Sequence, residues 1–447
     1  MMKRIFYFLM ICFAISACQD NDDFSTSTGL RLTFPSDTLM MDTVFSRTPS
    51  STYTFWVHND NDTGIRIQSA RLKRGNQTGF RVNMDGIYLD NSNGSQVSDL
   101  ELRSKDSLLV FVELTAAETG KPEPTVVEDD LLFILESGVE QKVNLRAWSW
   151  DARKLYSPVI TTDSVIESEQ PLVIYGDLRV EKGATLTIRN TVLFFHDQSG
   201  LEVFGTLQCE DCVIRGDRLD DMFDYLPYDR VSGQWKGIRF RETSHGNRFL
   251  RTEIRNPIDA IVCDSAALDS IGYRLEMEHC VIHNCQMAGL EAVNAHVRLN
   301  HCQLTNTGGH CLSLSGGIAE INRCTIAQFY PFAADRGAAL RFTNFYGNTT
   351  MPLRLTCDST IMTGYADDVV MGDMDGEDIG TFDYLFRSCL MRTPEVTEEK
   401  ERFENIIWET PKDSVQGKQH FVLIDEENLI YDFRLDSLST AQGLGCY

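Results

Sequence analysis

A 22-residue repeat in the second half of the chain is the feature that most restricts its fold. Cys280, Cys302 and Cys324 are spaced 22 residues apart, and each begins a short segment of β type. Other positions keep the same step, such as Leu290 and Leu312. A period near 22 with short β segments and no helical pattern between them is typical of a parallel β-helix, in which every coil pairs with the coils before and after it.

The cysteines of this repeat are predicted to point into the cylinder. A free cysteine packs as a small hydrophobic residue, so the three should stack about one strand spacing (~4.8 Å) apart. Asn284 and Asn306 end their strands, where asparagine tolerates left-handed backbone geometry. Leucine-rich repeats have a similar period but need a dense leucine consensus that is missing here. We therefore predict a parallel β-helix with a C-terminal cap over residues 151–447.

Residues 30–150 follow a different pattern. Short segments that alternate apolar and polar residues recur, for example 30–34, 52–57, 107–114 and 143–148, and turn residues such as Asn91-Ser92-Asn93-Gly94 separate them. Many short strands at this spacing are typical of an all-β sandwich. We predict an immunoglobulin-like β-sandwich that ends near Asp151.

The first residues carry the marks of export. Lys3 and Arg4 precede an apolar run over residues 5–14, which is too short to span a bilayer permanently. The small residues that follow end on Cys18, as in the lipobox of bacterial lipoproteins. We predict a signal peptide over 1–17, lipidation of Cys18 and an acidic, polar tether over 18–29. Several acyl chains on Cys18 would give stable anchoring in the outer membrane. The alternative is an ordinary signal peptide with a chance cysteine.

The net charge of the chain restricts the partners that it can bind. The net charge is −24, and loss of the two basic residues of the signal peptide lowers it to about −26. This charge excludes nucleic acid as a partner and is compatible with neutral sugars, cations or basic partners.

The cysteines lie mostly in the second half of the chain. There are 13 of them, and those of the mature chain other than Cys18 begin at Cys209. Their odd number argues against a complete disulfide framework. Cys209 and Cys212 form a lone CxxC, which favours coil-edge cysteines or a local disulfide over a zinc site.

The mature chain resembles a family of Bacteroidetes surface lipoproteins of the right-handed parallel β-helix type. The resemblance rests on DTVF at 42–45, FRVNMDG at 80–86, YLPYDR at 225–230, GQWKGI at 233–238 and YDFRL at 431–435 with Ser439 and Ala441. The acidic run after Cys18 is similar to the surface-export signal of such lipoproteins. The resemblance implies an all-β chain with a right-handed helix, anchored in the outer membrane and facing the cell exterior. It implies no activity.

Enzymes that cleave polysaccharides also use this fold, so their signatures were sought. Polygalacturonase-like sites carry Asn-Thr-Asp, Asp-Asp, Gly-His-Gly and Arg-Ile-Lys in neighbouring coils. The chain has Asp220-Asp221 and Asp367-Asp368 but lacks the other three. The sequence therefore favours a protein without catalytic activity, with a lyase or hydrolase as the alternative.

An insertion at 217–235 interrupts the coil pattern and gathers aromatic and charged side chains. The candidate ligand-binding residues are Asp220, Asp221, Tyr225, Tyr228, Arg230 and Trp235. Aromatic faces with polar rims hold sugar rings. The alternative is a loop folded down as a structural cap.

A second candidate row consists of His279, His301 and Arg323, one residue before each repeat cysteine. These side chains should point outward, side by side on one sheet. They could bind a sugar acid, a phosphate or a metal. A solvated outer face is the simpler interpretation.

Calcium is the one cofactor that the sequence hints at. Asp373, Asp375, Glu377 and Asp378 partly resemble a calcium loop but lack the third aspartate and the terminal glutamate of an EF-hand. A solvated acidic loop is the simpler interpretation.

The leading functional hypothesis is a surface lipoprotein that binds glycans or other surface proteins, or that acts as a scaffold. The alternative without a ligand is a structural or adhesive protein.

Overall fold

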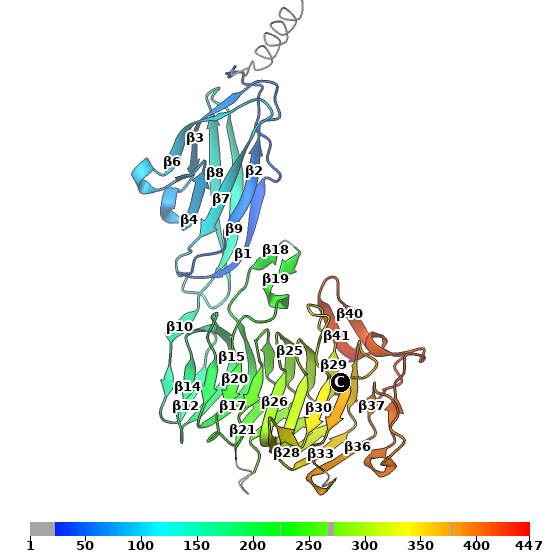
Figure 1. Ribbon diagram of the computed structural model, residues 1–447. Coiled ribbons are helices and arrows are strands. Elements are labelled where there is room, and N and C mark those ends of the chain that lie inside the picture. The colour runs from blue at the N-terminus through cyan, green and yellow to red at the C-terminus, as the bar shows by residue number, and fades with distance from the viewer. Residues whose placement is uncertain (1–22, 224, 267–271, 377–378) are drawn as a thin grey trace, which may run out of the picture. The chain divides into compact units, whose positions relative to one another are not determined.

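The computed structural model of the chain describes residues 23–223, 225–266, 272–376 and 379–447 (Figure 1). The chain divides into two compact units after Asp151. The predicted lipidation site Cys18 and signal peptide lie outside the described residues. The last part of the predicted tether packs against the first unit. Ser25 N donates to Gly64 O at 3.0 Å, and the guanidinium of Arg66 lies over the Phe24 ring.

The first unit consists of two sheets that share one hydrophobic core. One sheet has the order β1 (Thr38–Phe45), β9 (Glu140–Trp150), β8 (Thr125–Leu135), β3 (Ile65–Leu72) and β6 (Gln96–Leu102). The other has the order β2 (Tyr53–His58), β7 (Ser107–Leu114), β4 (Phe80–Met84) and β5 (Ile87–Tyr88). Alternate residues of each strand, such as Val110 and Val112 of β7, are fully buried. The predicted strand at 30–34 is reduced to a single bridge between Thr33 and His58.

The second unit is built on one parallel sheet of 26 strands, wound so that each strand pairs with strands of the coils before and after it. This is a parallel β-helix-like arrangement with three ladders. Ladder 1 comprises β10 (Arg153–Tyr156), β13 (Leu172–Tyr175), the second halves of β15 (Thr185–Phe195) and β17 (Thr206–Gly216), β22 (Glu253–Arg255), β25 (Val281–Cys285), β27 (Gln303–Thr307), β29 (Thr325–Gln328), β34 (Ile361–Gly364), β37 (Leu390–Met391) and β39 (Ile407–Trp408).

The other two ladders complete each coil. Ladder 2 comprises β12 (Ser164–Glu167), the first halves of β15 and β17, β21 (Asn247–Leu250), β24 (Leu275–Glu278), the second halves of β26 (Leu290–Asn300) and β28 (Leu312–Asn322), β33 (Leu353–Asp358), β36 (Phe382–Arg387) and β38 (Phe403–Glu404). Ladder 3 comprises β11 (Val159–Ile160), β14 (Leu178–Val180), β16 (Leu201–Val203), β20 (Ile238–Phe240), β23 (Ile261–Cys263), the first halves of β26 and β28, β30 (Leu340–Thr343) and β35 (Val370–Asp373).

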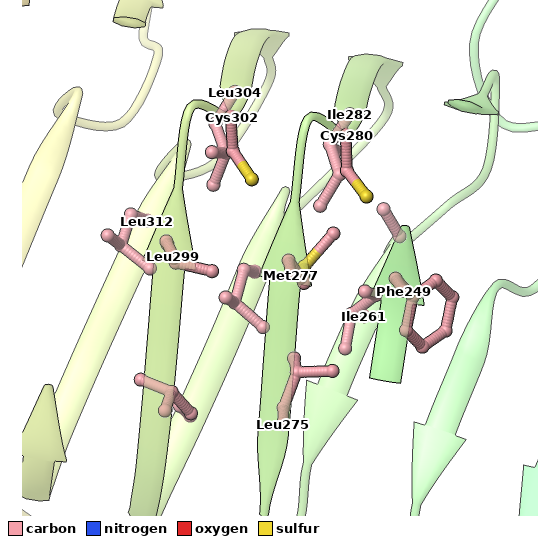
Figure 2. Packing of buried hydrophobic residues seen from close by; sticks show 14 of the residues in the cluster. Phe249, Ile261, Leu275, Met277, Cys280, Ile282, Leu299, Cys302, Leu304 and Leu312 are labelled. Carbon is pink, nitrogen blue, oxygen red and sulfur yellow. The ribbon is translucent and has the colours of Figure 1, made fainter. Parts of the chain in front are cut away.

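The repeat found in the sequence is the register of the sheet. Leu290 pairs with Leu312, and Val281 pairs with Gln303. Inward residues of successive coils stack into one core, and Figure 2 shows Cys280 and Cys302 at equivalent places in neighbouring coils. The predicted inward stack of cysteines is confirmed, since Cys280, Cys302 and Cys324 are at most 1% exposed. Cys209 and Cys212 are buried free thiols, so the local disulfide is not formed.

A sharp corner joins ladder 2 to ladder 1 in the coils from β15 onwards. One residue there takes a left-handed backbone conformation, with φ of 52° at His279, 50° at His301 and 49° at Arg323. In most of these coils the next residue is a cysteine or threonine whose thiol or hydroxyl donates to the carbonyl two residues before it, as Cys302 Sγ does to Asn300 O (3.3 Å) and Thr360 Oγ1 does to Asp358 O (2.8 Å). The exceptions are Thr191, whose hydroxyl has no partner among the described residues, and Ile406. The corner therefore selects for a small side chain that can donate one hydrogen bond.

The C-terminal segment folds back over the outer face of ladder 1. Its hairpin, β40 (Phe421–Asp425) and β41 (Ile430–Leu435), places Phe421 and Phe433 against Phe329, which follows β29, and against outward residues of β29, β34 and β37. The outward residues of β27 are buried as well, as Gln303 and Thr305 show. Among the described residues, no helix is long and apolar enough to cross a membrane.

Candidate functional site

A cleft of about 500 Å³ lies on the outer face of ladder 1, where the cover formed by the C-terminal segment ends. Its floor is formed by β22, β25 and β27, one wall by β41, and the opposite rim by the end of the insertion. The lining residues that the argument uses are Asp229, Glu253, Arg255, His283, Gln303, Phe332, Tyr431 and Tyr447. All of them belong to the second unit.

The β-helix register brings the floor residues together. Ile254, Ile282 and Leu304 point inward and are fully buried, so their neighbours on each strand point outward. Arg255 pairs with His283, and Glu253 belongs to the column that continues through Gln303. Side chains from three coils therefore lie next to one another, although up to 50 positions separate them along the chain.

The charged groups of the floor form a closed network. Arg255 binds Glu253, with Nη2 to Oε2 at 3.0 Å, and its Nη1 lies 3.5 Å from Asp229 Oδ1. Arg215 binds the same Asp229 oxygen at 2.7 Å. The floor therefore presents paired charges and hydrogen-bonding groups.

His283 stands at the centre of the cleft. Its Nδ1 lies 2.8 Å from Thr305 Oγ1, and its ring meets the rings of Tyr431 and Phe433 edge-on at 5.4 and 6.1 Å. Desolvation and the positive charge of Arg255 lower the pKa of His283 to about 4. The imidazole is thus neutral near pH 7, where it can offer both a donor and an acceptor.

The hydroxyl groups of two tyrosines in the cleft, Tyr447 and Tyr431, have different surroundings. Tyr447 donates to Gln303 Oε1 at 2.6 Å and is 59% exposed. The hydroxyl of Tyr431 is buried and has no hydrogen-bond partner among the described residues. Burial, followed by the charges of Glu426 and Asp425, raises the pKa of Tyr431, so the group stays protonated. A buried hydroxyl without a partner is rare in folded proteins.

The insertion does not form the aromatic platform that the sequence suggested. Trp235 is wrong as a sugar-stacking residue, because it is fully buried, stacks on Phe195 at 4.7 Å and donates its indole N–H to Arg255 O. Asp220 is 7% exposed and held by Arg218, whose guanidinium lies over the Tyr228 ring.

The other predicted residues of the insertion lie in two different places, a small hairpin and the cleft. Asp221 and Tyr225 lie in or beside the small hairpin of β18 (Asp221–Phe223) and β19 (Leu226–Pro227), where the Tyr225 ring is 78% exposed and stacks on Phe223. Arg230 lies on the cleft, and its Nη1 donates to Asn428 O at 2.6 Å. Arg230 is thus the one residue of the predicted set that lines the cleft.

The second candidate row lies at the corner of the coils, not on a sheet. The His279 and His301 rings stack at 4.8 Å, while Arg323 donates to Gly443 O at 3.2 Å. Desolvation, His279 and Arg323 lower the pKa of His301. The left-handed corner conformation, which the sequence did not reveal, explains the difference.

The calcium candidates are only partly described. Asp373 ends β35, and the main chain of Asp375 is bonded to Asn344 through its N–H (2.7 Å) and carbonyl (3.0 Å). Glu377 and Asp378 lie outside the described residues. Within the described part of the chain, no group of three or more His, Cys, Asp or Glu side chains could hold a metal ion.

Sequence reasoning missed most of the cleft. Glu253, Arg255 and His283 occupy outward positions directly after the corner in successive coils, and this shared position was the available signal. Tyr431 was noticed only as part of a motif. Its partner surface lies in coils more than 100 residues earlier, which no local pattern indicates.

The sequence matches no protein family and no curated protein. Among solved structures, Dex49A from Penicillium minioluteum aligns with 79% of this chain and 73% of its own, at 7% identity and a TM-score of 0.22. A family 123 glycoside hydrolase from Clostridium perfringens aligns with 31% of this chain and 30% of its own, at 6% identity and a TM-score of 0.20. The YadV chaperone aligns with 26% of this chain and 50% of its own, at 9% identity and a TM-score of 0.18. This chain therefore spans half the length of the chaperone. Scores this low carry no functional information.

Proposed function

We propose that the protein is a surface-exposed outer-membrane lipoprotein whose β-helix unit binds a glycan in the cleft. The observation that carries the proposal is Tyr431, a residue of the cleft lining whose buried hydroxyl has no hydrogen-bond partner among the described residues. A sugar hydroxyl would satisfy it. We further propose that the helix is right-handed and that the first unit is an immunoglobulin-like sandwich.

The composition of the cleft favours a sugar over other small ligands. Phe332, Tyr431 and Tyr447 offer apolar ring surface, whereas Gln303 and neutral His283 offer hydrogen bonds. Sugars combine these two characters, with apolar ring faces and hydroxyl rims. The charges of the floor already neutralise one another, and the chain carries a net charge of −24, so we favour a neutral glycan.

Binding is favoured over cleavage because Arg255 contacts both carboxylates of the floor. A hydrolase needs one carboxylic acid that is protonated and one carboxylate that acts as base or nucleophile. Asp229 and Glu253 are instead both engaged in ion pairs with Arg255. A lyase or hydrolase therefore remains the second reading, and a structural or adhesive protein without a ligand is the third.

Replacement Tyr431→Phe tests the cleft. It removes only the hydroxyl, so affinity for the glycan should fall about five- to tenfold, as expected for the loss of one hydrogen bond to a ligand. The melting temperature should stay unchanged or rise, because the hydroxyl has no protein partner to lose. A glycan array would identify a ligand, and calorimetry would compare the variants.

The matched control is Tyr346→Phe, which removes the hydroxyl of a tyrosine that is 50% exposed in another part of the unit. Equal affinities of wild type and Tyr431→Phe would place the binding site outside the cleft. Wild-type protein that binds no glycan on the array would favour the structural or adhesive role, and release of reducing or unsaturated ends would favour the enzyme.

Replacement Cys18→Ala tests the anchor. The lipobox-like segment 15–18 predicts acylation of this cysteine, and several acyl chains are needed for stable membrane attachment. The variant should lose acyl labelling and move from the membrane fraction to the soluble fraction. Unchanged acyl labelling of the variant would remove the basis for the proposed localisation. Cys12→Ala, which alters a cysteine inside the signal peptide, is the control and should leave labelling intact.

A further inference from the structure

The sheet of β2, β7, β4 and β5 in the first unit carries aromatic rings on its outer face. Trp56 is 48% exposed, Phe111 39% and Tyr88 51%. The inner face of the same strands is apolar and buried, so the outward rings add nothing to the core. In an antiparallel sheet with one solvated face, outward positions are normally polar. Three large exposed rings on one such face require another explanation.

The strand register fixes how these rings are arranged. Phe111 lies opposite Thr54 of β2 and opposite Asn83 of β4, and Asn83 in turn lies opposite Tyr88 of β5. Trp56 is two residues beyond Thr54 on β2. The rings therefore follow one another across the strands, and two strand spacings (~9.6 Å) separate Phe111 from Tyr88.

The surroundings of the rings differ along the face. Leu109 lies opposite Trp56 and is partly exposed, so these two side chains form one apolar patch. Thr54 and Asn83 flank Phe111 on its two neighbouring strands, and Asn83 separates Phe111 from Tyr88. Apolar surface that alternates with hydrogen-bonding groups in this way suits a ligand with apolar faces and hydroxyl rims, which is the character of a chain of sugars.

The charges of this face cancel one another. Arg81 Nη2 binds Glu113 Oε2 at 2.7 Å, and Thr52 donates to the other carboxylate oxygen at 2.9 Å. The chain as a whole carries a net charge of −24, which repels polyanions. The net charge thus excludes a polyanion, and the pairing of Arg81 with Glu113 favours an uncharged partner for this face.

We infer that this face is a second binding surface, which takes an extended chain of neutral sugars across the strands. It is independent of the cleft, since it lies on the other unit and shares no residue with it. Its shape also differs, because an open sheet face suits a long polysaccharide, whereas the cleft encloses a shorter glycan.

The test uses the full-length chain with a panel of soluble neutral polysaccharides, namely a β-glucan, a mannan and a xylan, in affinity gel electrophoresis. The double change Trp56→Ala, Phe111→Ala should weaken retardation by at least one of them about tenfold or more, because ring stacking contributes most of such binding. Both residues point away from the core, so the melting temperature should stay within a few degrees of wild type. The matched control is Tyr346→Ala, an exposed aromatic residue of the second unit.

Three outcomes decide the inference. Loss of retardation in the double variant, with retardation kept in Tyr431→Phe and Tyr346→Ala, would support a surface distinct from the cleft. Unchanged retardation in the double variant, or no retardation of wild type by any of the three polysaccharides, would overturn it. Concentration-dependent dimers of wild type that disappear in the double variant would also overturn it, because the face would then bind a second copy of the chain.

Discussion

Replacement of Cys302 by aspartate should lower the free energy of unfolding by about 3–5 kcal/mol, the cost of an unpaired charge in a buried site. The thiol is fully buried in the core of the β-helix and donates to Asn300 O. A carboxylate at this place would face carbonyl oxygen and the neighbouring thiols of Cys280 and Cys324. Urea unfolding followed by circular dichroism measures the change.

The control for this variant comes from the protein itself. Thr252 and Thr360 occupy the same corner position in other coils and donate to the equivalent carbonyls at 3.1 and 2.8 Å. Cys302→Thr should therefore cost less than about 1.5 kcal/mol, because it keeps both the volume and the donor. If Cys302→Asp unfolds at the same urea concentration as wild type, the inward register of the repeat is wrong.

Replacement Glu409→Leu should cost a similar amount, about 3–5 kcal/mol, because it leaves buried Arg392 without its main partner. Glu409 and Arg392 are 2% and 7% exposed, and Nη1 lies 2.5 Å from Oε1. The carboxylate also accepts from Thr363 Oγ1 (2.8 Å) and from the main-chain N–H of Gly417. It thereby fastens the C-terminal segment to ladder 1. Urea unfolding near pH 7 measures the loss.

The same variant has a signature in its pH dependence. Burial alone would raise the pKa of Glu409, but hydrogen bonds from His420, Arg392 and Thr363 outweigh it and lower the pKa below its ordinary value of 4.5. A depressed carboxyl pKa stabilises the fold above the unfolded pKa, and this contribution is lost as the pH falls through the folded pKa. The difference in stability between wild type and Glu409→Leu should therefore shrink below about pH 4.5. Glu167→Leu, which breaks an exposed pair with Arg189, is the control and should cost far less stability than Glu409→Leu. Equal losses in the two variants would contradict a structural role for the buried pair.

The repeat predicted the β-helix-like arrangement because a parallel ladder converts sequence period directly into register. Cys280, Cys302 and Cys324 stack in space because they recur at one step in the chain. The corner conformation of His279 and His301 was not visible in the same pattern, since residues other than glycine seldom adopt positive φ. An outward row was therefore expected on a sheet, where the chain in fact turns.

The cleft could not be predicted because it depends on contacts between distant segments. Arg230 reaches Asn428, and Tyr447 reaches Gln303, across separations of 198 and 144 residues.

The prediction of a sugar-stacking Trp235 in the insertion failed for a related reason. Composition marks a segment as inserted but does not show where the chain rejoins the coil, and Trp235 is already part of the core at that point.

The buried cysteines set a condition on how this chain can fold in an oxidising compartment. In the finished fold the free thiols other than Cys446 are buried, and burial raises the pKa of Cys263 and Cys311 to about 12. Thiolate, the species that reacts with oxidants and disulfides, is then scarce at these two residues. Before a coil closes, its thiol has no such protection. Repeat proteins add units to a nucleus one neighbour at a time, so each new coil shields the cysteine of the coil beneath it. Outside the cytoplasm, successful maturation is then a race between coil closure and oxidation, and speed of growth matters as much as final stability.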